Sequence, residues 1–164
     1  MVNERQGEFM RILAGAICRE IGARNFYGKI SDAIRNPEGK EKFKRLSNDE
    51  EGHRIKLESW YKKLFDKAFV GDKKELKDAE IKGIPIDEKT GAMAALDIAI
   101  KAEMKAEEFY SSQAEAVEDP QFKDLLVKLA GEEHGHYEFL LAERNSLTGG
   151  FYWFDMDSSA FLED

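Results

Sequence analysis

The sequence contains three histidines, and two of them stand three residues after a glutamate. The two pairs are Glu50 with His53, in DEEGHRIKL, and Glu133 with His136, in EEHGHYEFL. Residues three apart lie on the same face of a helix, so both side chains can reach the same metal ion. Carboxylate oxygen and imidazole nitrogen suit iron, manganese or zinc. A single pair of this kind is more often a solvent-facing contact, but two matched pairs favour a metal site.

The two pairs belong to a tandem repeat. Glu133 follows Glu50 by 83 positions, and His136 follows His53 by the same 83. No gap is needed to extend the match over most of one helical hairpin. At this offset the matched pairs include Glu20 with Glu103, Phe26 with Phe109, Tyr27 with Tyr110, Pro37 with Pro120, Leu46 with Leu129, Gly52 with Gly135 and Leu57 with Leu140.

Each repeat unit has the pattern of two long helices. Helix-forming residues with an apolar stripe cover residues 5–35, 37 to about 69, about 90–117, and 120 to about 147. Asn36-Pro37 and Asp119-Pro120 separate the helices of each pair. Residues 71–91 contain glycines and a proline and read as a long crossover loop. The sequence therefore predicts an all-α four-helix bundle over residues 1–150, made of two tandem hairpins, followed by an aromatic tail at 151–164.

Polar residues interrupt the apolar stripes near the middle of every helix. Glu50 and His53 lie on the stripe that ends at Leu57, and Glu133 and His136 lie on the stripe that ends at Leu140. Buried carboxylates are costly unless a positive charge balances them, and two divalent ions would balance four of them. The alternative is a bundle that kept the repeat and no longer binds metal. The candidate ligands are Glu20, Glu50, His53, Glu103, Glu133 and His136.

These motifs resemble the rubrerythrin family of the ferritin-like superfamily. The residues that carry the resemblance are E20-IGARNF-Y27, E50-EG-H53, E103-MKAEEF-Y110 and E133-HG-H136, and it covers about residues 5–147. The resemblance implies that Glu50 and Glu133 bridge two metal ions. It also implies that Glu20 with His53, and Glu103 with His136, are terminal ligands. Tyr27 and Tyr110 would donate hydrogen bonds to the carboxylates, and simple aromatic packing is the alternative for both.

Two features depart from the family pattern. Typical members carry a rubredoxin-like segment with four cysteines, which has no counterpart among these residues, where Cys18 is the single cysteine. They also have a further glutamate one turn after the ligand of the third helix. Here Ala106 takes that place, as Ala23 does in the first helix, and Glu107 is at a different angle. The chain therefore looks like a stand-alone rubrerythrin-like protein, and a peroxidase mechanism that uses the further glutamate is not expected.

The functional expectation is a di-iron oxidoreductase of the peroxidase or ferroxidase type. Peroxide, O2 or Fe2+ would be the substrate, a separate protein would donate electrons, and a role in oxidative stress would follow. Iron is the expected metal, with manganese or zinc as alternatives. Two other functions stay open, namely metal handling without turnover and an interaction protein whose metal pair only stabilises the bundle.

The amino-acid composition limits the expected partners and location of the protein. Apolar residues make up 42% of the chain, charged residues 35%, and the net charge is −8. An acidic surface repels phosphate, so nucleic acid is not an expected partner. We expect no membrane span, a cytoplasmic location and a homodimer. His134 should lie at the surface or at an interface, and Cys18 should be a small buried apolar residue. The aromatic run at 151–157 should cover apolar surface, with a docking or dimer patch as the alternative.

Overall fold

The computed structural model describes residues 4–81 and 88–148 of the chain, and helices are the regular secondary structure found there. The elements are α1 (Glu4–Ala33), α2 (Pro37–Phe65), α3 (Lys73–Asp78), α4 (Glu88–Ala116) and α5 (Pro120–Thr148). The four predicted long helices are confirmed, with ends that differ by a few residues. The predicted tail at 151–164 lies outside the described residues.

The described residues belong to two compact units. One unit is drawn from Met1–Lys29 and Lys42–Lys82, and the other from Ile30–Glu41 and Gly83–Asp164. The first therefore holds most of α1 and α2 together with α3, and the second holds α4 and α5. The division follows the sequence repeat except at the turn between α1 and α2, which belongs to the second unit.

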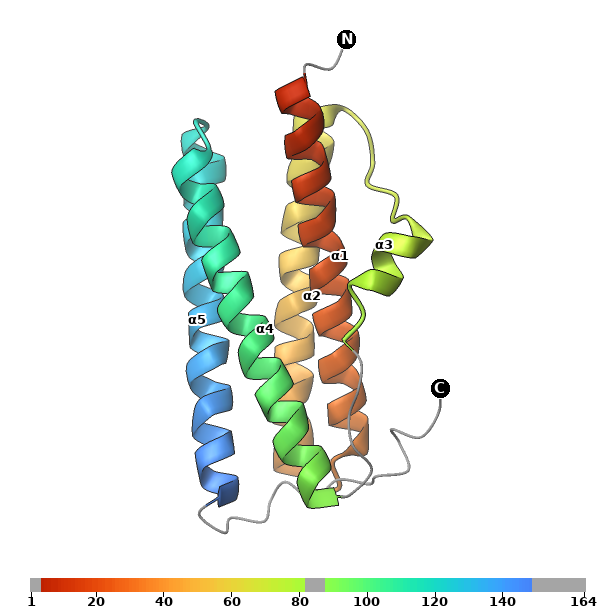
Figure 1. Ribbon diagram of the computed structural model, residues 1–164, viewed down its shortest axis with the longest axis vertical. Helices are drawn as coiled ribbons and strands as arrows, with labels where there is room; N and C mark the ends of the chain where they lie inside the picture. The colour runs from red at the N-terminus through yellow and green to blue at the C-terminus, as the bar shows by residue number, and fades with distance from the viewer. Residues whose placement is uncertain (1–3, 82–87, 149–164) are drawn as a thin grey trace. The chain divides into compact units, whose positions relative to one another are not determined.

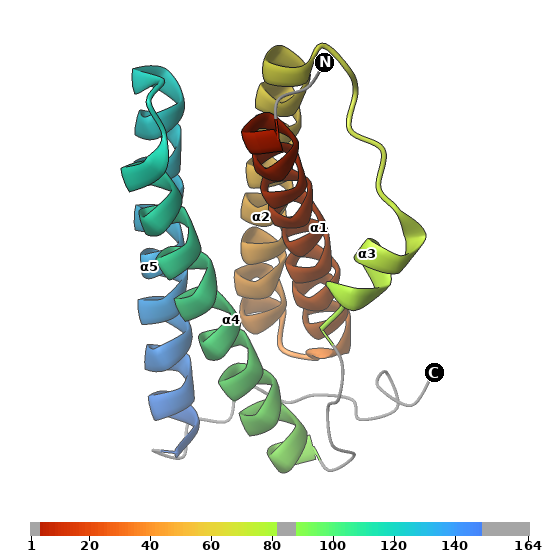
Figure 2. The same cartoon turned by 45° about the horizontal axis from the view of Figure 1, so that its top comes forward.

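In the first unit, α1 and α2 lie side by side and run in opposite directions (Figure 1 and Figure 2). Asn36 precedes Pro37, and its side-chain oxygen accepts hydrogen bonds from the backbone N–H groups of Glu38 at 2.9 Å and Gly39 at 3.2 Å. Such a cap starts α2 directly after α1 has ended. The core residues of this unit are the apolar ones predicted from the stripes, including Leu13, Ala16, Ile17, Phe43, Leu46 and Leu57.

The segment between α2 and α4 differs from the predicted loop. Helix α2 ends at Phe65 rather than near Phe69, because Asp66 adopts a left-handed backbone conformation with φ of 51°. The short helix α3 then lies beside α1 in both views (Figure 1 and Figure 2). An ion pair of 2.8 Å between Lys74 and Asp78 joins its two ends. A Cβ atom added to Gly22 of α1 would overlap the carbonyl oxygen of Ala79, so glycine is what allows this close approach.

In the second unit, α4 and α5 run in opposite directions, side by side near the turn that joins them and further apart at their other ends (Figure 1 and Figure 2). The side chain of Asp119 caps α5, because its Oδ1 atom accepts a hydrogen bond of 2.9 Å from the N–H of Phe122. An ion pair between Asp97 and Arg144 joins the two helices. Most of the predicted apolar stripe is buried, although Leu125 and Ala106 are only half-buried. Its members include Leu96, Ala99, Phe122, Leu126, Leu129 and Leu140.

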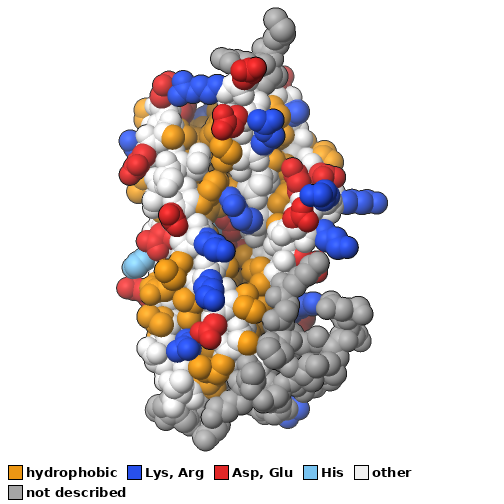
Figure 3. Space-filling view, viewed as in Figure 1, with side chains coloured by type: hydrophobic (Ala, Val, Ile, Leu, Met, Phe, Trp, Pro, Cys, Tyr) orange, Lys and Arg blue, Asp and Glu red, His pale blue; other side chains and the backbone are white. Residues whose placement is uncertain are grey.

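The surface carries mixed charge. On the face shown in Figure 3, acidic and basic side chains are interspersed, with hydrophobic side chains between them. None of the helices in the described part of the chain combines the length and the apolar character that a bilayer span requires.

Candidate metal centre

Three predicted ligands come together in the first unit. Glu20 extends from α1, and Glu50 and His53 extend from α2, one turn apart. The Nδ1 atom of His53 lies 3.1 Å from Glu50 Oε2 and 3.6 Å from Glu20 Oε2. These side chains are almost fully buried, with 4% of Glu20 and 1% of each of the others exposed. The first unit thus holds a buried triad of two carboxylates and one imidazole.

The second unit holds the matching triad. Glu103 extends from α4, and Glu133 and His136 extend from α5. The Nδ1 atom of His136 lies 3.2 Å from Glu133 Oε2 and 3.7 Å from Glu103 Oε1. All three residues are buried. Each distance is within 0.1 Å of its counterpart in the first unit, so the sequence repeat is also a repeat of site geometry.

The donor atoms of each triad are spaced as ligands of one ion. In either triad the three atoms lie within 4.8 Å of one another. Metal bonds to imidazole nitrogen and carboxylate oxygen are about 2.1 Å long, so two donors on the same ion stand about 3 Å apart. Two carboxylates and one neutral imidazole also carry the −2 charge that one divalent cation balances. The residues present therefore fit the metal that the sequence predicts.

The pKa of Glu103 in the second triad also favours a cation-binding site. The pKa of Glu103 is raised from 4.5 to about 7, mainly by burial; the hydrogen bond with His136 opposes this rise and the nearby Glu133 carboxylate adds to it. A carboxyl group with such a pKa is still partly protonated near neutral pH, and a bound cation would take the place of the proton. The triad can thus bind either protons or metal.

Each hairpin buries one tyrosine of the matched pair Tyr27 and Tyr110. Tyr27 and Tyr110 are buried, with 1% and 2% exposed. The ring of Tyr27 packs 5.8 Å from that of Phe26, and the ring of Tyr110 packs 5.3 Å from that of Phe109. The repeat therefore extends to these aromatic pairs. The predicted hydrogen bonds from the tyrosines to the ligands stay a prediction.

The outer faces of the two hairpins differ at the same level. In the first unit, Arg24 of α1 contacts Glu51 of α2 at 2.7 Å. The matching positions of the second unit are Glu107 and His134, whose side chains lie 3.1 Å apart. The cross-helix pair is kept, but its polarity is reversed. The Glu107 carboxylate is part-exposed and lies against His134, and that it does not replace the further glutamate of the family pattern stays a prediction.

One buried carboxylate was not predicted. Glu143 of α5 is 8% exposed and lies on the same stripe as His136 and Leu140. Its repeat counterpart is Trp60, so the internal comparison gave no reason to expect a buried acid there. The heptad spacing from His136 was the available signal. His134 and Cys18 lie as predicted, the first at the surface and the second buried.

Comparison with known proteins identifies relatives. The family model described as Rubrerythrin matches residues 11–144. Among solved structures, the hypothetical protein Pfu-1136390-001 from Pyrococcus furiosus is similar, with 32% sequence identity and a TM-score of 0.76. The match covers 89% of this chain and 95% of that one. A search of curated proteins gives no match.

The fold and the triads define an all-α protein of the ferritin-like class with buried carboxylate–histidine ligands. Because the Rubrerythrin model matches residues 11–144, the chain belongs to the rubrerythrin family. The family resemblance and the fold class predicted from the motifs are therefore confirmed.

Proposed function

We propose that the two triads together hold a pair of metal ions and that the protein is a di-iron oxidoreductase. The observation that carries the proposal is the duplicated triad, which is buried and has the same donor spacing in both units. Four carboxylates balance two divalent cations. Iron is the metal we propose, because the carboxylate-rich donor set with one imidazole per ion is the set of ferritin-like di-iron proteins.

The protein's own groups would supply ligands, proton exchange and exclusion of water. An iron pair supplies two electrons to an oxidant, for which we propose hydrogen peroxide or O2. Glu103 would release its remaining proton when the ion binds, because its raised pKa of about 7 leaves the carboxyl partly protonated near neutral pH. The near-complete burial of Glu50 and Glu133 keeps bulk water from their oxygens. A separate protein in the cytoplasm would return the electrons.

The proposal is tested in two steps with the full chain. Anaerobic titration with Fe2+ should reach about two ions per chain. Peroxide is then mixed with the loaded protein, and absorption in the near ultraviolet reports the oxidised iron pair. We expect rapid oxidation, followed by full reduction when a chemical reductant is added, over many cycles. One iron per chain, or no binding, would overturn the dinuclear assignment.

A matched pair of variants separates the site from the surface. Glu103→Gln removes a ligand charge from α4, whereas Glu107→Gln removes the same charge one turn later on its outer face. We expect the first to reduce iron content and the second to leave it unchanged. Equal effects would mean that overall charge, rather than the triad, controls binding.

Metal handling without turnover is the second candidate function. It is favoured by the protonated state of Glu103, which would make metal release easier as pH falls. Iron that binds with the expected stoichiometry but reacts with neither peroxide nor O2 would favour this function over the first.

A further inference from the structure

Three charged side chains join α1 to α2 beside the first triad. Arg54 of α2 donates two hydrogen bonds to the carboxylate of Glu51, from Nε at 2.8 Å and from Nη2 at 2.6 Å. Arg24 of α1 donates a third to the same carboxylate, from Nη1 at 2.7 Å. Two guanidinium groups on one carboxylate fix both its position and its orientation. We call Arg24, Glu51 and Arg54 the arginine network.

The arginine network lies at the turns that carry the first triad. Each of its members is within four residues of a ligand on the same helix, in the pairs Arg24 with Glu20, Glu51 with Glu50 and Arg54 with His53. Ser47 of α2 adds a second bond between the helices, because its hydroxyl group donates a hydrogen bond of 2.9 Å to the carbonyl oxygen of Arg24. The side chains of the network are 21% to 33% exposed, so water and salt screen them only in part.

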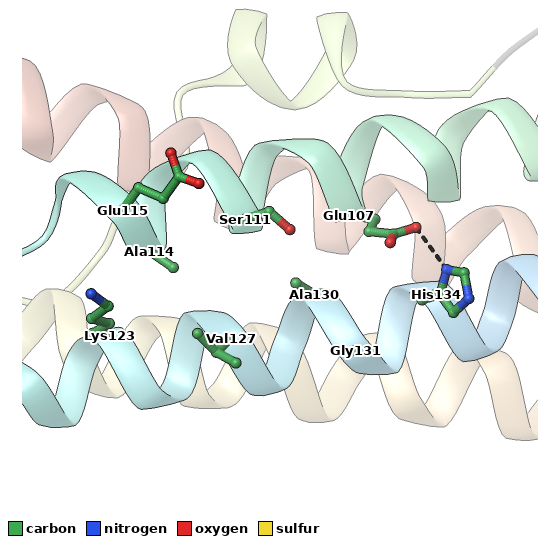
Figure 4. A pocket seen from close by; sticks show the side chains of 9 residues that line it. All are labelled: Glu107, Ser111, Ala114, Glu115, Lys123, Val127, Ala130, Gly131 and His134. Atoms are coloured by element: carbon green, nitrogen blue, oxygen red, sulfur yellow. Dashed lines mark hydrogen bonds and ion pairs between the residues drawn. The ribbon is translucent and has the colours of Figure 1, made fainter.

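The residues of the arginine network are not repeated in the second hairpin. At the offset of 83 positions, Arg24 is matched by Glu107, Glu51 by His134, Arg54 by Tyr137 and Ser47 by Ala130. Figure 4 shows the contact of Glu107 with His134, at 3.1 Å, and the small side chains of Ala114 and Ala130 between the same two helices. The side chains of this pair are 35% and 49% exposed, and ion pairs so exposed contribute little.

An ion pair of the second hairpin lies farther from its ligands. Asp97 and Arg144 join α4 to α5. Asp97 is six residues before Glu103, however, and Arg144 is eight residues after His136. This pair therefore holds the two helices together about two turns away from the second triad, rather than at the turns that carry its ligands.

We propose that Arg24, Glu51 and Arg54 are positioning residues for the first triad, and that the second triad is the one that exchanges its metal ion. This inference rests on the proposed pair of metal ions. An ion leaves only when its ligands separate, and ligands that outer contacts hold in place separate more rarely. Such outer contacts change metal affinity by about 10–100-fold in other metal sites. The two ligand sets are thus alike in kind and different in rigidity.

Release of Zn2+ from the full chain tests the inference, because zinc takes the same donor types and has no redox chemistry. The chain is loaded with about two zinc ions and mixed with an excess of the chelating dye pyridylazoresorcinol, whose absorbance reports released zinc. We expect two phases of equal amplitude, with rates that differ by about tenfold or more. Glu20→Gln should speed the slow phase and Glu103→Gln the fast phase, which assigns each phase to its triad.

Variants of the arginine network should change the slow phase alone. Arg24→Gln and Arg54→Gln should each speed it by about tenfold and leave the fast phase unchanged. Arg24→Lys should restore slow release, because Arg24 gives Glu51 a single hydrogen bond that an ammonium group can replace. Glu107→Gln is the matched control in the second hairpin and should leave the slow phase unchanged. Circular dichroism establishes that each variant is folded.

The sequence repeat also allows the network to be transferred. The triple variant Glu107→Arg, His134→Glu and Tyr137→Arg places the same three residue types at the matching positions of the second hairpin. Its fast phase should slow toward the rate of the slow phase. A general gain in stability would instead slow both phases.

The possible failures are distinguishable. Two zinc ions that leave the wild-type chain in one phase would show equally rigid triads and would overturn this inference alone. Arg24→Gln that speeds both phases equally would mean that the network stabilises the whole chain and does not position the first triad. Fewer than two zinc ions per chain would overturn the proposed metal pair, and this inference with it.

Discussion

The Nδ1 atom of His53 lies 3.1 Å from the Oε2 atom of Glu50, and the same relationship recurs between His136 and Glu133 at 3.2 Å. Both pairs are buried and both come from one turn of helix. The two halves of the chain therefore present equal sets of candidate ligands, although their outer faces differ.

Loss of one ligand should have the same effect in either half. Glu20→Gln and Glu103→Gln should lower metal affinity equally, on the order of tenfold or more. If Glu50 and Glu133 each bridge two ions, Glu50→Gln and Glu133→Gln should cost more, because each then weakens both ions. Calorimetric titration of the four variants measures this. Unequal losses within a matched pair would contradict the symmetry, and four equal losses would contradict bridging.

The metal-free protein should lose stability as pH rises through neutrality. Burial raises the pKa of Glu103 from 4.5 to about 7. The folded state then holds more protons than the unfolded state between these values. The free energy of unfolding is therefore highest below pH 4.5 with respect to this group and falls as pH rises through about 7, by up to ~3 kcal/mol. Bound metal should remove the loss.

Thermal melts with and without metal at pH 5 and pH 8 would test this, and the gap between the two melting temperatures should be larger at the higher pH. Glu103→Gln is the control, because a neutral amide cannot titrate and should flatten the pH dependence of the metal-free protein. Identical melts with and without metal at pH 8 would argue against a buried metal site.

The sequence predicted both triads because each residue that bears on them is local to a helix. Glu50 and His53 share a face by spacing alone, and the repeat then identifies Glu20 and Glu103. Helix α3 was missed because six residues are too few for a periodic pattern. Its position depends on the contact of Ala79 with Gly22, far away in the sequence. Glu143 was missed because its burial depends on tertiary packing, and its repeat counterpart is a tryptophan.

Ala106→Glu should change access to the metal pair. Ala23 and Ala106 are matched, half-buried residues one turn after Glu20 and Glu103. We expect small anions such as azide to bind the oxidised protein beside them. A glutamate at position 106 should occupy such a place, weaken azide binding and leave about two metal ions per chain. Optical titration with azide measures this. Unchanged azide affinity would mean that anions bind elsewhere.

Gly22→Ala should release α3 from α1. The added methyl group overlaps the carbonyl oxygen of Ala79, and such overpacking costs about 1–3 kcal/mol. Limited proteolysis should then cleave the segment around α3 faster. Gly15→Ala is the control on the same helix, because nothing lies within 4 Å of its Cβ position. It should stabilise α1 by about 1 kcal/mol. Equal cleavage rates in both variants would contradict the role assigned to Gly22.

The contribution of the Arg24–Glu51 pair to stability should be lost at low pH, and that of the Glu107–His134 pair should be lost at high pH. The hydrogen bond from Arg54, helped by Arg24, lowers the pKa of Glu51 from 4.5 to about 2, so its contribution exists above pH 4.5 and is lost as pH falls toward 2. The hydrogen bond to Glu107 raises the pKa of His134 above 6.5, so its contribution exists below pH 6.5 and is lost as pH rises. Glu51→Gln should therefore destabilise about equally at pH 5 and pH 9, because Glu51 is ionised at both, whereas His134→Gln should destabilise mainly at pH 5. Urea unfolding of both variants at pH 5 and 9 measures the contrast, and parallel pH profiles would contradict it.

The reversed polarity of these pairs also bears on how a duplicated chain finds its correct helix partners while it folds. Two similar hairpins invite exchange, in which α1 would pair with α5 and α4 with α2. Correct pairing sets Arg24 against Glu51 and Glu107 against His134. An exchange would instead set Arg24 against a protonated His134, and Glu107 against Glu51, with like charges in both contacts. Similar sequences can thus be told apart by the cost of the wrong arrangement. In this chain the like-charge contacts of the wrong pairing form on the outer faces. The buried faces can therefore carry the same residues in both halves.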